Sequence, residues 1–338
     1  MVIEWTEWKD GTEHEWDAAL VKLEGYSVYQ AYGWGEYKRR TGWSVRRGSV
    51  LIDGSLEAMA QCLVRELRLP RVAIVWVPGG PAGTLAGRLH LGRALQERYR
   101  GWSLCLRTNI VVESRSEDAS AMAAAGWTPA THRVGHPLTF HLDLSDEEPL
   151  RRQALHGNWR HNLKRGEERG TEIRVLQATD PLDAIYPVYR EMSDLKGLAT
   201  TLGLDDLAGL RSALGANFMI AASFERDGAP SGVRAFARIG ERAYDLIAAV
   251  TEAGRREYAS YPLLWTLLAR ARSEGVRMYD LSGADPVDAA GVYNFKRGLG
   301  GREVKMLGEW EWATSRVLRW GINRLLAGRS VKAREGVA

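Results

Sequence analysis

Residues 291–301 read GVYNFKRGLGG and place two cations and two aromatic side chains among four glycines. The glycines permit sharp turns and a close approach of the backbone to a ligand. Phe295, Lys296 and Arg297 supply a flat apolar face beside two positive charges. This combination suits an anionic ligand or a transition state in which negative charge develops. A glycine-rich β-turn with solvated cations is the competing interpretation.

Two further groups of basic residues stand out in a chain whose net charge is only +4. The first holds Arg151, Arg152, Arg160, Lys164, Arg165, His156 and His161, and the second holds Arg316, Arg319, Arg324, Arg329, Lys332 and Arg334 against Glu335 alone. Such groups attract phosphates or anionic lipid headgroups. Helix faces that are simply solvated are the alternative interpretation of both.

Length and composition indicate an ordinary globular protein. The 338 residues fit two domains of roughly 150 residues each. No run approaches the roughly eighteen apolar residues of a membrane span, and the charged start MVIEWTEWKDGTEHEWD lacks the order of a signal peptide. Cys62 and Cys105, the only cysteines, are expected to be reduced thiols in the core of a cytoplasmic protein.

The first half of the chain predicts a parallel crossover. VAIVWV reads as a buried strand that ends in the loop PGGPAG, LAGRLHLGRALQERYRG as a helix, and SLCLRTNIVVE as a second strand. Before this unit, residues 15–23 and 54–67 are predicted as helices and residues 29–43 as a strand with a turn. After it, HPLTFHLDL predicts a strand, followed by a helix with Ser145 as its N-cap.

The second half follows a similar plan. Residues 217–250 predict a meander of three antiparallel strands, YPLLWTLLARARSEG a helix and VRMYDLSGA another strand. Both halves thus contain a strand, a glycine-containing loop, a helix and a further strand, a similarity of pattern rather than of residues. The final segment, residues 311–328, predicts an amphipathic helix. Its expected apolar contacts are Val317, Leu318, Ile322, Leu325 and Leu326.

YDLSGADP, followed by GVYNFKRGLGG and a strand ending near GEWEW, resembles the C-terminal signature of the FemABX family of peptidoglycan bridge aminoacyltransferases. Four other segments, YQAYGWGEYKRRTGW, VWVPGGPAG, NWRHNLKRGEERGTEIRV and ASYPLLWTLLARARSEG, are similar to family motifs in the same order. No single motif is long, but together they span nearly the whole chain. The resemblance implies an α+β fold of two tandem GNAT-like (acyl-CoA N-acyltransferase-like) domains with mixed central sheets flanked by helices. We expect domains at 1–145 and 146–308, with a C-terminal helix in 309–338 that packs back on the first.

The resemblance implies transfer of an amino acid from aminoacyl-tRNA to an amine of the stem peptide of a lipid-linked or nucleotide-linked muropeptide, in a cleft between the two domains. It assigns Lys296 and Phe295 to the transfer step and Lys38 to the phosphates of the muropeptide. The further substrate contacts expected are Tyr32, Trp34, Tyr293, Arg297, Gly283 and Asp280. Aminoacyl-tRNA is then a co-substrate, and neither a cofactor nor a metal is expected. The implied location is the cytoplasm, with peripheral contact at the inner face of the membrane.

Two positions depart from the family pattern. Asn109, in LRTNIVV, stands where family members commonly carry an acidic residue that is proposed as a base, and an amide cannot accept that proton. An arginine expected after EMSDLKGLATT is not evident, and Lys196 is the nearest cation. Asp280 and Asp285 are substitute bases, although aspartates beside Ser-Gly at the end of a strand more often cap turns.

Two other functions remain open. The first is an N-acyltransferase of the same fold, which takes its acyl group from coenzyme A and modifies a polysaccharide or a small molecule. The segment GRREYAS before a helix suits the pyrophosphate of coenzyme A. However, the usual glycine-rich loop is missing, because no second glycine follows Gly254. A nonenzymatic basic module that binds RNA or a membrane is the third reading. The sequence contains no HExxH, no GxSxG and no Walker loop, so metal-dependent hydrolysis and serine acyl transfer lack support.

Overall fold

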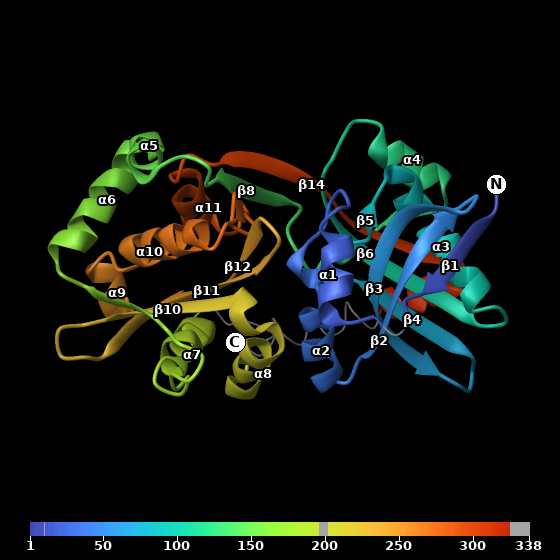
Figure 1. Cartoon of the computed structure of the whole chain (residues 1–338), viewed down its shortest axis with the longest axis horizontal. Helices are drawn as coiled ribbons and strands as arrows, with labels where there is room; N and C mark the ends of the chain where they lie inside the picture. Colours follow the sequence, from blue (N-terminus) through green and yellow to red (C-terminus); the bar gives the residue numbers. More distant parts are fainter. Residues whose placement is uncertain (10, 196–201, 325–338) are drawn as a thin grey trace. The chain divides into compact units, whose positions relative to one another are not determined.

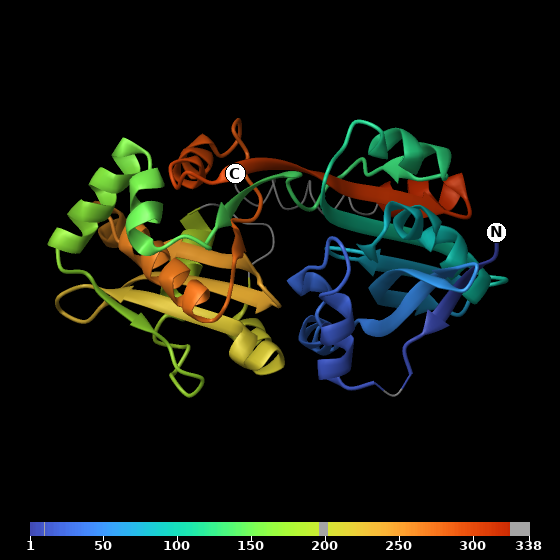
Figure 2. The same ribbon diagram turned by 45° about the horizontal axis from the view of Figure 1, so that its top comes forward.

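The computed structural model describes residues 1–9, 11–195 and 202–324, with the side chain of Leu195 excepted. The chain divides into two compact units. The first contains Met1–Pro137 together with residues 305–324, and the second contains Leu138–Val304. Each unit is a β-sheet flanked by helices (Figure 1, Figure 2).

The sheet of the first unit has the strand order β1-β2-β3-β4-β6-β14. These strands are β1 (Ile3–Glu7), β2 (Ser44–Ile52), β3 (Ser55–Leu67), β4 (Val72–Val77), β6 (Ser103–Glu113) and β14 (Arg302–Ala313), and the short β5 (Ala82–Gly83) and β7 (Thr128–Pro129) pair with β3 and β14. Only β4 and β6 run parallel among the strand pairs described in this unit, and α3 (Leu85–Arg98) connects them. The predicted crossover is therefore confirmed.

The other helices of the first unit are α1 (Glu13–Leu20), the 3-10 turn Val28–Gln30, α2 (Tyr32–Arg40), α4 (Asp118–Ala124) and a helix that occupies residues 316–324. The predicted helix near 15–23 is confirmed as α1, which Thr12 and Glu15 start with a capping box. Both cysteines are free and buried as predicted, and burial raises the pKa of Cys105 to about 12.

The prediction of a helix at 54–67 is wrong, because these residues form β3. From Ala58 to Val64 every residue of this strand is buried. Ala58, Ala60 and Cys62 belong to the core that includes residues of α3, whereas Gln61 hydrogen-bonds to the backbone on the side of the 3-10 turn. A strand covered on both faces shows no alternation of polar and apolar residues, and its Leu, Ala, Met and Gln content favours a helix locally.

The prediction of a strand and turn at 29–43 is also wrong, because residues 32–40 form α2. Its aromatic residues and its two glycines favour other structure locally. The helix is nevertheless stabilised by tertiary contacts, since Trp34 and Tyr37 are buried, and the carboxylate of Asp17 accepts a 2.8 Å hydrogen bond from the N–H of Tyr32. Tertiary packing thus overrides the local preference.

The sheet of the second unit has the order β8-β13-β12-β11-β10-β9. The strands are β8 (Leu138–Asp143), β9 (Glu172–Val175), β10 (Phe218–Phe224), β11 (Pro230–Ile239), β12 (Arg242–Val250) and β13 (Met278–Asp280). The three-strand meander is confirmed as β10, β11 and β12, which are antiparallel. β13 then pairs parallel with β12, and β8 pairs antiparallel with β13.

The helices of this unit are α5 (Glu148–Ala154), α6 (Gly157–Glu168), α7 (Tyr186–Leu195), α8 (Leu204–Leu214), the 3-10 turn Gly215–Asn217, α9 (Glu252–Arg256), α10 (Ser260–Ser273) and α11 (Ala290–Arg297). Figure 1 shows α10 and α7 on opposite faces of the sheet, and both contact β11 and β12. The predicted cap Ser145 is wrong: α5 has Glu147 at its N-cap, and the N–H of Ser145 donates to Asp143 instead.

The C-terminal segment is only partly as predicted. Residues 311–313 complete β14, and the helix begins at residue 316. Val317, predicted as an apolar contact, is 77% exposed, so that prediction is wrong, whereas Leu325 and Leu326 lie outside the described residues. Across the described ranges, no helix has the length and apolar character needed to cross a membrane.

Candidate active site

α11 carries most of the motif GVYNFKRGLGG. Residues 290–297 are helical, so the β-turn interpretation is wrong for Phe295, Lys296 and Arg297, and the chain turns only from Gly298 onward. Gly300 has a φ of +78°, and a Cβ there would lie 2.5 Å from the carbonyl oxygen of Ala154. This glycine is therefore required by backbone conformation and by packing.

Lys296 is buried, with only 7% of its surface exposed. Its ammonium donates hydrogen bonds to the carbonyl oxygens of Gly283, at 2.6 Å, and Ser282, at 3.2 Å. Ser282 has a φ of +60°, which is unusual for a residue other than glycine. The lysine therefore holds the loop that follows β13, and the loop in turn holds the cation.

Hydrogen bonds of Asp280 and Ser282 hold this loop in its conformation. The buried carboxylate of Asp280 accepts hydrogen bonds from the N–H of Ser282, at 2.7 Å, and from the hydroxyl of Thr139, and His141 Nε2 lies 3.4 Å from its other oxygen. Asp285 caps the next turn by accepting from the N–H groups of residues 287 and 288. Both aspartates thus act as turn caps in this structure.

Beneath the loop lies a buried ion pair that the sequence analysis missed. Arg234 on β11 donates two hydrogen bonds, of 3.0 and 2.6 Å, to the carboxylate of Asp245 on β12, and both side chains are 6% exposed. The hydroxyl of Tyr279 donates to the same carboxylate at 3.1 Å. The Ser282 hydroxyl donates to the backbone carbonyl of Asp245, which ties the loop that holds Lys296 to this pair.

Phe295 belongs to an aromatic cluster rather than to the loop. Its ring centroid lies 5.1 Å from that of Tyr261 on α10 and 5.6 Å from that of Trp159 on α6. The guanidinium carbon of Arg234 lies 5.7 Å from the same ring. Consecutive residues of a helix point about 100° apart, so Phe295 and Lys296 face different surroundings although they are neighbours in sequence.

A hollow of about 710 Å³ lies beside this cluster. It is lined by His156, Gly157, Asn158, Trp159, Asn162, Tyr261, Gly291, Asn294, Phe295, Arg297 and Gly298. Aromatic faces, amides, the Arg297 cation and the partly positive N-terminus of α6 together suit a flat, anionic ligand. Lys296 does not line the hollow, so the structure places the two residues of the predicted pair in adjoining sites.

Tyr293 and Arg297 lie one turn apart on α11, with the guanidinium carbon of Arg297 5.7 Å from the Tyr293 ring. The Tyr293 hydroxyl donates to Glu303, and its ring contacts Phe140. The second unit therefore brings together six of the predicted site residues. These are Asp280, Gly283, Tyr293, Phe295, Lys296 and Arg297.

The remaining three predicted residues lie in the first unit, on α2. The ammonium of Lys38 lies 5.2 Å from the Trp34 ring and 4.6 Å from the Tyr37 ring. The guanidinium carbon of Arg47 lies 3.6 Å from the ring of Tyr32. Lys38 and Tyr32 are half-buried and form a cationic and aromatic surface within this unit, whereas Trp34 is buried beneath Lys38.

Arg47 and Asp17 position this surface, and the sequence analysis missed both. The buried Arg47 side chain donates to Gln61, at 2.7 Å, and to the Tyr32 carbonyl and Glu36, both at 2.8 Å. Burial raises the pKa of Asp17 to about 6 from its ordinary 3.8, although the hydrogen bond from Tyr32 lowers it. No local motif in the sequence marks either residue.

The raised pKa of Asp17 predicts a pH-dependent stability. Between pH 3.8 and 6 the folded protein binds this proton more tightly than the unfolded chain, so stability falls as the pH rises through that window. Asp17→Asn retains an oxygen acceptor for Tyr32. The variant is therefore expected to have a free energy of unfolding higher than the parent by up to about 3 kcal/mol at pH 8, and unchanged at pH 4. Urea unfolding at both pH values measures the difference, with exposed Asp146→Asn as the control; an equal effect at pH 4 contradicts the prediction.

Asn109 lies on β6, directly opposite Glu309 on β14. The buried Glu309 carboxylate accepts from Arg107 and, at 2.7 Å each, from the N–H groups of Val134 and Gly135. Acidic residues are unusual inside a buried strand, so the EWEW pattern of Glu309 and Glu311 carried a signal that the sequence analysis did not use. A carboxylate therefore does lie beside Asn109, on the neighbouring strand, where it pairs with Arg107.

Two further residues that the sequence singled out are Lys196 and Gly254. Lys196 lies outside the described residues. A Cβ on Gly254 would lie 2.3 Å from the Ser231 carbonyl oxygen, so this glycine packs α9 against β11. Within the residues that the structure describes, no three His, Cys, Asp or Glu side chains gather as metal ligands would.

Part of the chain matches a known protein family. Residues 235–325 match the model of the FemAB family, and this range contains the loop after β13 and all of α11. No curated protein sequence matches the chain at a significant level.

Solved structures are similar over most of the chain. The crystal structure of FemX covers 95% of this chain and 100% of its own, with a TM-score of 0.81 and 16% identity. A tandem GNAT protein from the clavulanic acid biosynthesis pathway covers 93% and 99%, with a TM-score of 0.56 and 14% identity. L-PGS from Bacillus licheniformis covers 92% and 96%, with a TM-score of 0.54 and 15% identity. The predicted fold of two tandem GNAT-like domains with mixed sheets is confirmed.

Proposed function

We propose that this chain is an aminoacyltransferase that forms peptidoglycan bridges, because residues 235–325 match the model of the FemAB family. The donor is aminoacyl-tRNA, and the acceptor is an amine of the stem peptide on a lipid-linked or nucleotide-linked precursor. One observation carries the proposal: the family match includes both the buried Lys296 and the loop that holds it.

In the proposed reaction, the neutral amine of the acceptor attacks the ester carbonyl carbon of the donor. A C–N bond forms, and the carbonyl oxygen becomes an oxyanion. The C–O bond to the tRNA ribose then breaks, and the ribose oxygen takes up the proton that the amine loses. The fixed positive charge of Lys296 stabilises the oxyanion electrostatically, because its surroundings exclude most water.

The hollow beside Phe295 and the surface around Lys38 contact different parts of the substrates. The hollow beside Phe295, with aromatic faces, amides and Arg297, suits a nucleotide or peptide portion of a substrate. In the first unit, the half-buried Lys38 and Tyr32 suit the phosphates and the sugar of the cell-wall precursor, and the buried Trp34 supports Lys38 from below. Asn109 cannot act as a base, which fits a reaction in which the leaving oxygen accepts the proton.

A coenzyme A-dependent N-acyltransferase remains the alternative, because the tandem GNAT protein has a similar fold. One observation weighs against it. Gly254, the only glycine in the segment that precedes α10, is required for packing against Ser231 rather than for wrapping a pyrophosphate. A nonenzymatic role in binding RNA or a membrane is the third possibility.

Donor discrimination tests the proposal. The purified full chain is incubated with a fraction of cell-wall precursors and either labelled aminoacyl-tRNAs or labelled acyl-coenzyme A. We expect the label to enter the precursor from tRNA alone. Label transferred from coenzyme A alone supports the alternative, and transfer from neither donor, with a FemX-type enzyme active in the same mixture, overturns both enzymatic proposals.

A further inference from the structure

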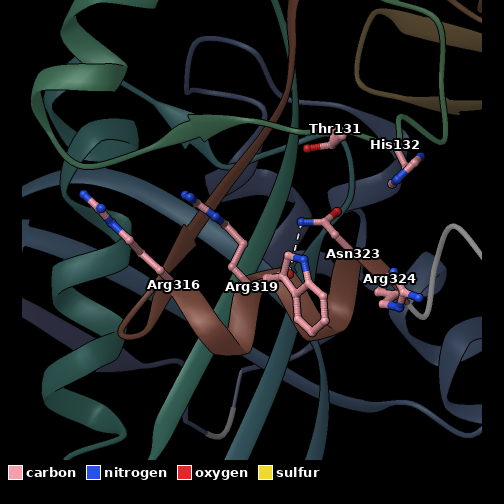
Figure 3. Close-up of a pocket in the computed structure, with 7 residues that line it drawn as sticks. Thr131, His132, Arg316, Arg319, Asn323 and Arg324 are labelled. Atoms are coloured by element: carbon pink, nitrogen blue, oxygen red, sulfur yellow. Dashed lines mark hydrogen bonds between the residues drawn. The ribbon is translucent and has the colours of Figure 1, made fainter.

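A second hollow, of about 410 Å³, lies in the first unit between the loop after β7 and the C-terminal helix of residues 316–324. It is lined by Thr131, His132, Arg316, Arg319, Trp320, Asn323 and Arg324 (Figure 3). None of these residues is acidic, and none belongs to the sites discussed above. Within the described chain, three arginines therefore gather on one short helix beside a hollow.

The hollow is built by specific contacts. The guanidinium of Arg319 donates to the hydroxyl of Thr128, which ties the helix to β7. The amide nitrogen of Asn323 donates to Glu311, at 2.7 Å, and to the Arg319 carbonyl, at 3.2 Å. Figure 3 shows Arg316 and Arg324 at opposite ends of the row of labelled side chains, on either side of Arg319 and Asn323. Arg316 and Arg324 are eight residues apart, which is about 12 Å along the helix, so these cations suit phosphates at the two ends of a short segment of one strand.

Two features indicate that the ligand carries bases as well as phosphates. Trp320 is 64% exposed, and the guanidinium carbon of Arg324 lies 5.6 Å from its ring, so a flat ring can stack on an indole already flanked by a cation. Asn323 Oδ1 is buried and has no hydrogen-bond partner among the described residues. A base amino group or a ribose hydroxyl can donate to this acceptor, whereas a bare phosphate cannot.

We infer that this hollow, here called the Trp320 hollow, binds an unpaired stretch of RNA. One base stacks on Trp320, and the flanking phosphates pair with Arg316 and Arg324. A membrane surface is less suitable, because Val317 and Trp320 are the only large apolar side chains of the described helix that are strongly exposed. The inference deepens the proposed function and depends on it only for the identity of the RNA, which would be the tRNA donor.

Direct binding tests the inference without any transfer reaction. A fluorescently labelled single-stranded RNA of about twelve nucleotides is titrated with the full chain between 50 and 200 mM salt, and its anisotropy is followed. Trp320→Ala is expected to weaken binding on the order of tenfold, and Trp320→Phe to retain most of the affinity, because stacking needs an aromatic ring. Replacing both Arg316 and Arg324 by Gln is expected to reduce the slope of log K against log salt by roughly 1.4, or about 0.7 for each phosphate contact.

Arg100→Gln is the matched control, since the Arg100 side chain is 84% exposed in the same unit and is expected to have no effect. Because Trp320 is largely exposed, its variants are expected to melt at the temperature of the parent. Unchanged RNA affinity in Trp320→Ala overturns the inference. The inference is also overturned if the protein binds vesicles that contain anionic lipid through Trp320 and RNA does not compete with this binding.

Kinetics separate this inference from the proposed function. If both hold, Trp320→Ala raises KM for aminoacyl-tRNA and leaves kcat unchanged. If the parent binds RNA through Trp320 but transfers no amino acid, the inference stands and the proposed function fails. If the parent transfers amino acids and Trp320→Ala has the same KM, the inference fails and the proposed function stands.

Discussion

Lys296→Met is expected to lower the rate of aminoacyl transfer by about 10²–10³-fold, because a single donor of this kind contributes about 3–4 kcal/mol to stabilising an oxyanion. Methionine has nearly the length of lysine and no charge, so it fills the buried space while it removes the positive charge. Lys296→Arg retains the charge and is expected to keep part of the rate. Single-turnover transfer at saturating donor and acceptor measures the effect.

A structural role of Lys296 must be separated from this electrostatic role, because its ammonium also donates to the carbonyls of Ser282 and Gly283. Loss of these two hydrogen bonds is expected to lower the free energy of unfolding by about 1–3 kcal/mol. Thermal unfolding of both variants therefore accompanies the kinetics. A Lys296→Met protein that is folded at the assay temperature and transfers at the parental rate contradicts the assignment.

Asp245→Asn is expected to lower the free energy of unfolding by about 3–5 kcal/mol, which is the largest effect on stability that we predict. The substitution leaves the guanidinium of Arg234 buried without its carboxylate, at a position where both side chains are 6% exposed. The Tyr279 hydroxyl also loses a charged acceptor. Urea unfolding followed by tryptophan fluorescence measures the change.

Two further variants make this test specific. Glu172→Gln breaks an ion pair with Arg174 whose side chains are 55% and 54% exposed, and it is expected to cost less than about 1 kcal/mol. Replacing Arg234 by Met and Asp245 by Leu together removes both charges and is expected to recover part of the lost stability. If Asp245→Asn costs no more than Glu172→Gln, the buried pair does not stabilise the second unit more than an exposed ion pair does.

Much of the fold could be predicted where a single pattern dominates. The crossover of β4, α3 and β6 followed from an apolar run, a glycine-proline loop and a helical period, and the structure matches it closely. The meander of β10, β11 and β12 followed from alternating strands separated by turns. In both cases the local preference of the residues agrees with the final fold.

The misassigned elements are those in which local preference and packing disagree. β3 is covered on both faces and is rich in helix-forming residues, whereas α2 is rich in aromatic residues and glycine. Contacts from residues distant in sequence decide both elements. Asp17, for example, holds the first residue of α2 at a separation of 15 residues.

The sequence by itself determined the types and the order of the chemical groups, because they depend only on composition and spacing: Phe295 beside Lys296, cations on 316–324 and an amide at Asn109. Only the tertiary structure decided what those groups contact. Lys296 contacts the loop after β13 and Phe295 lines the hollow, because neighbouring side chains on a helix point in different directions. Between strands, Arg234 pairs with Asp245, and Glu309 lies opposite Asn109. Such pairings depend on strand register and on burial, which involve residues far apart in the chain and leave no local pattern.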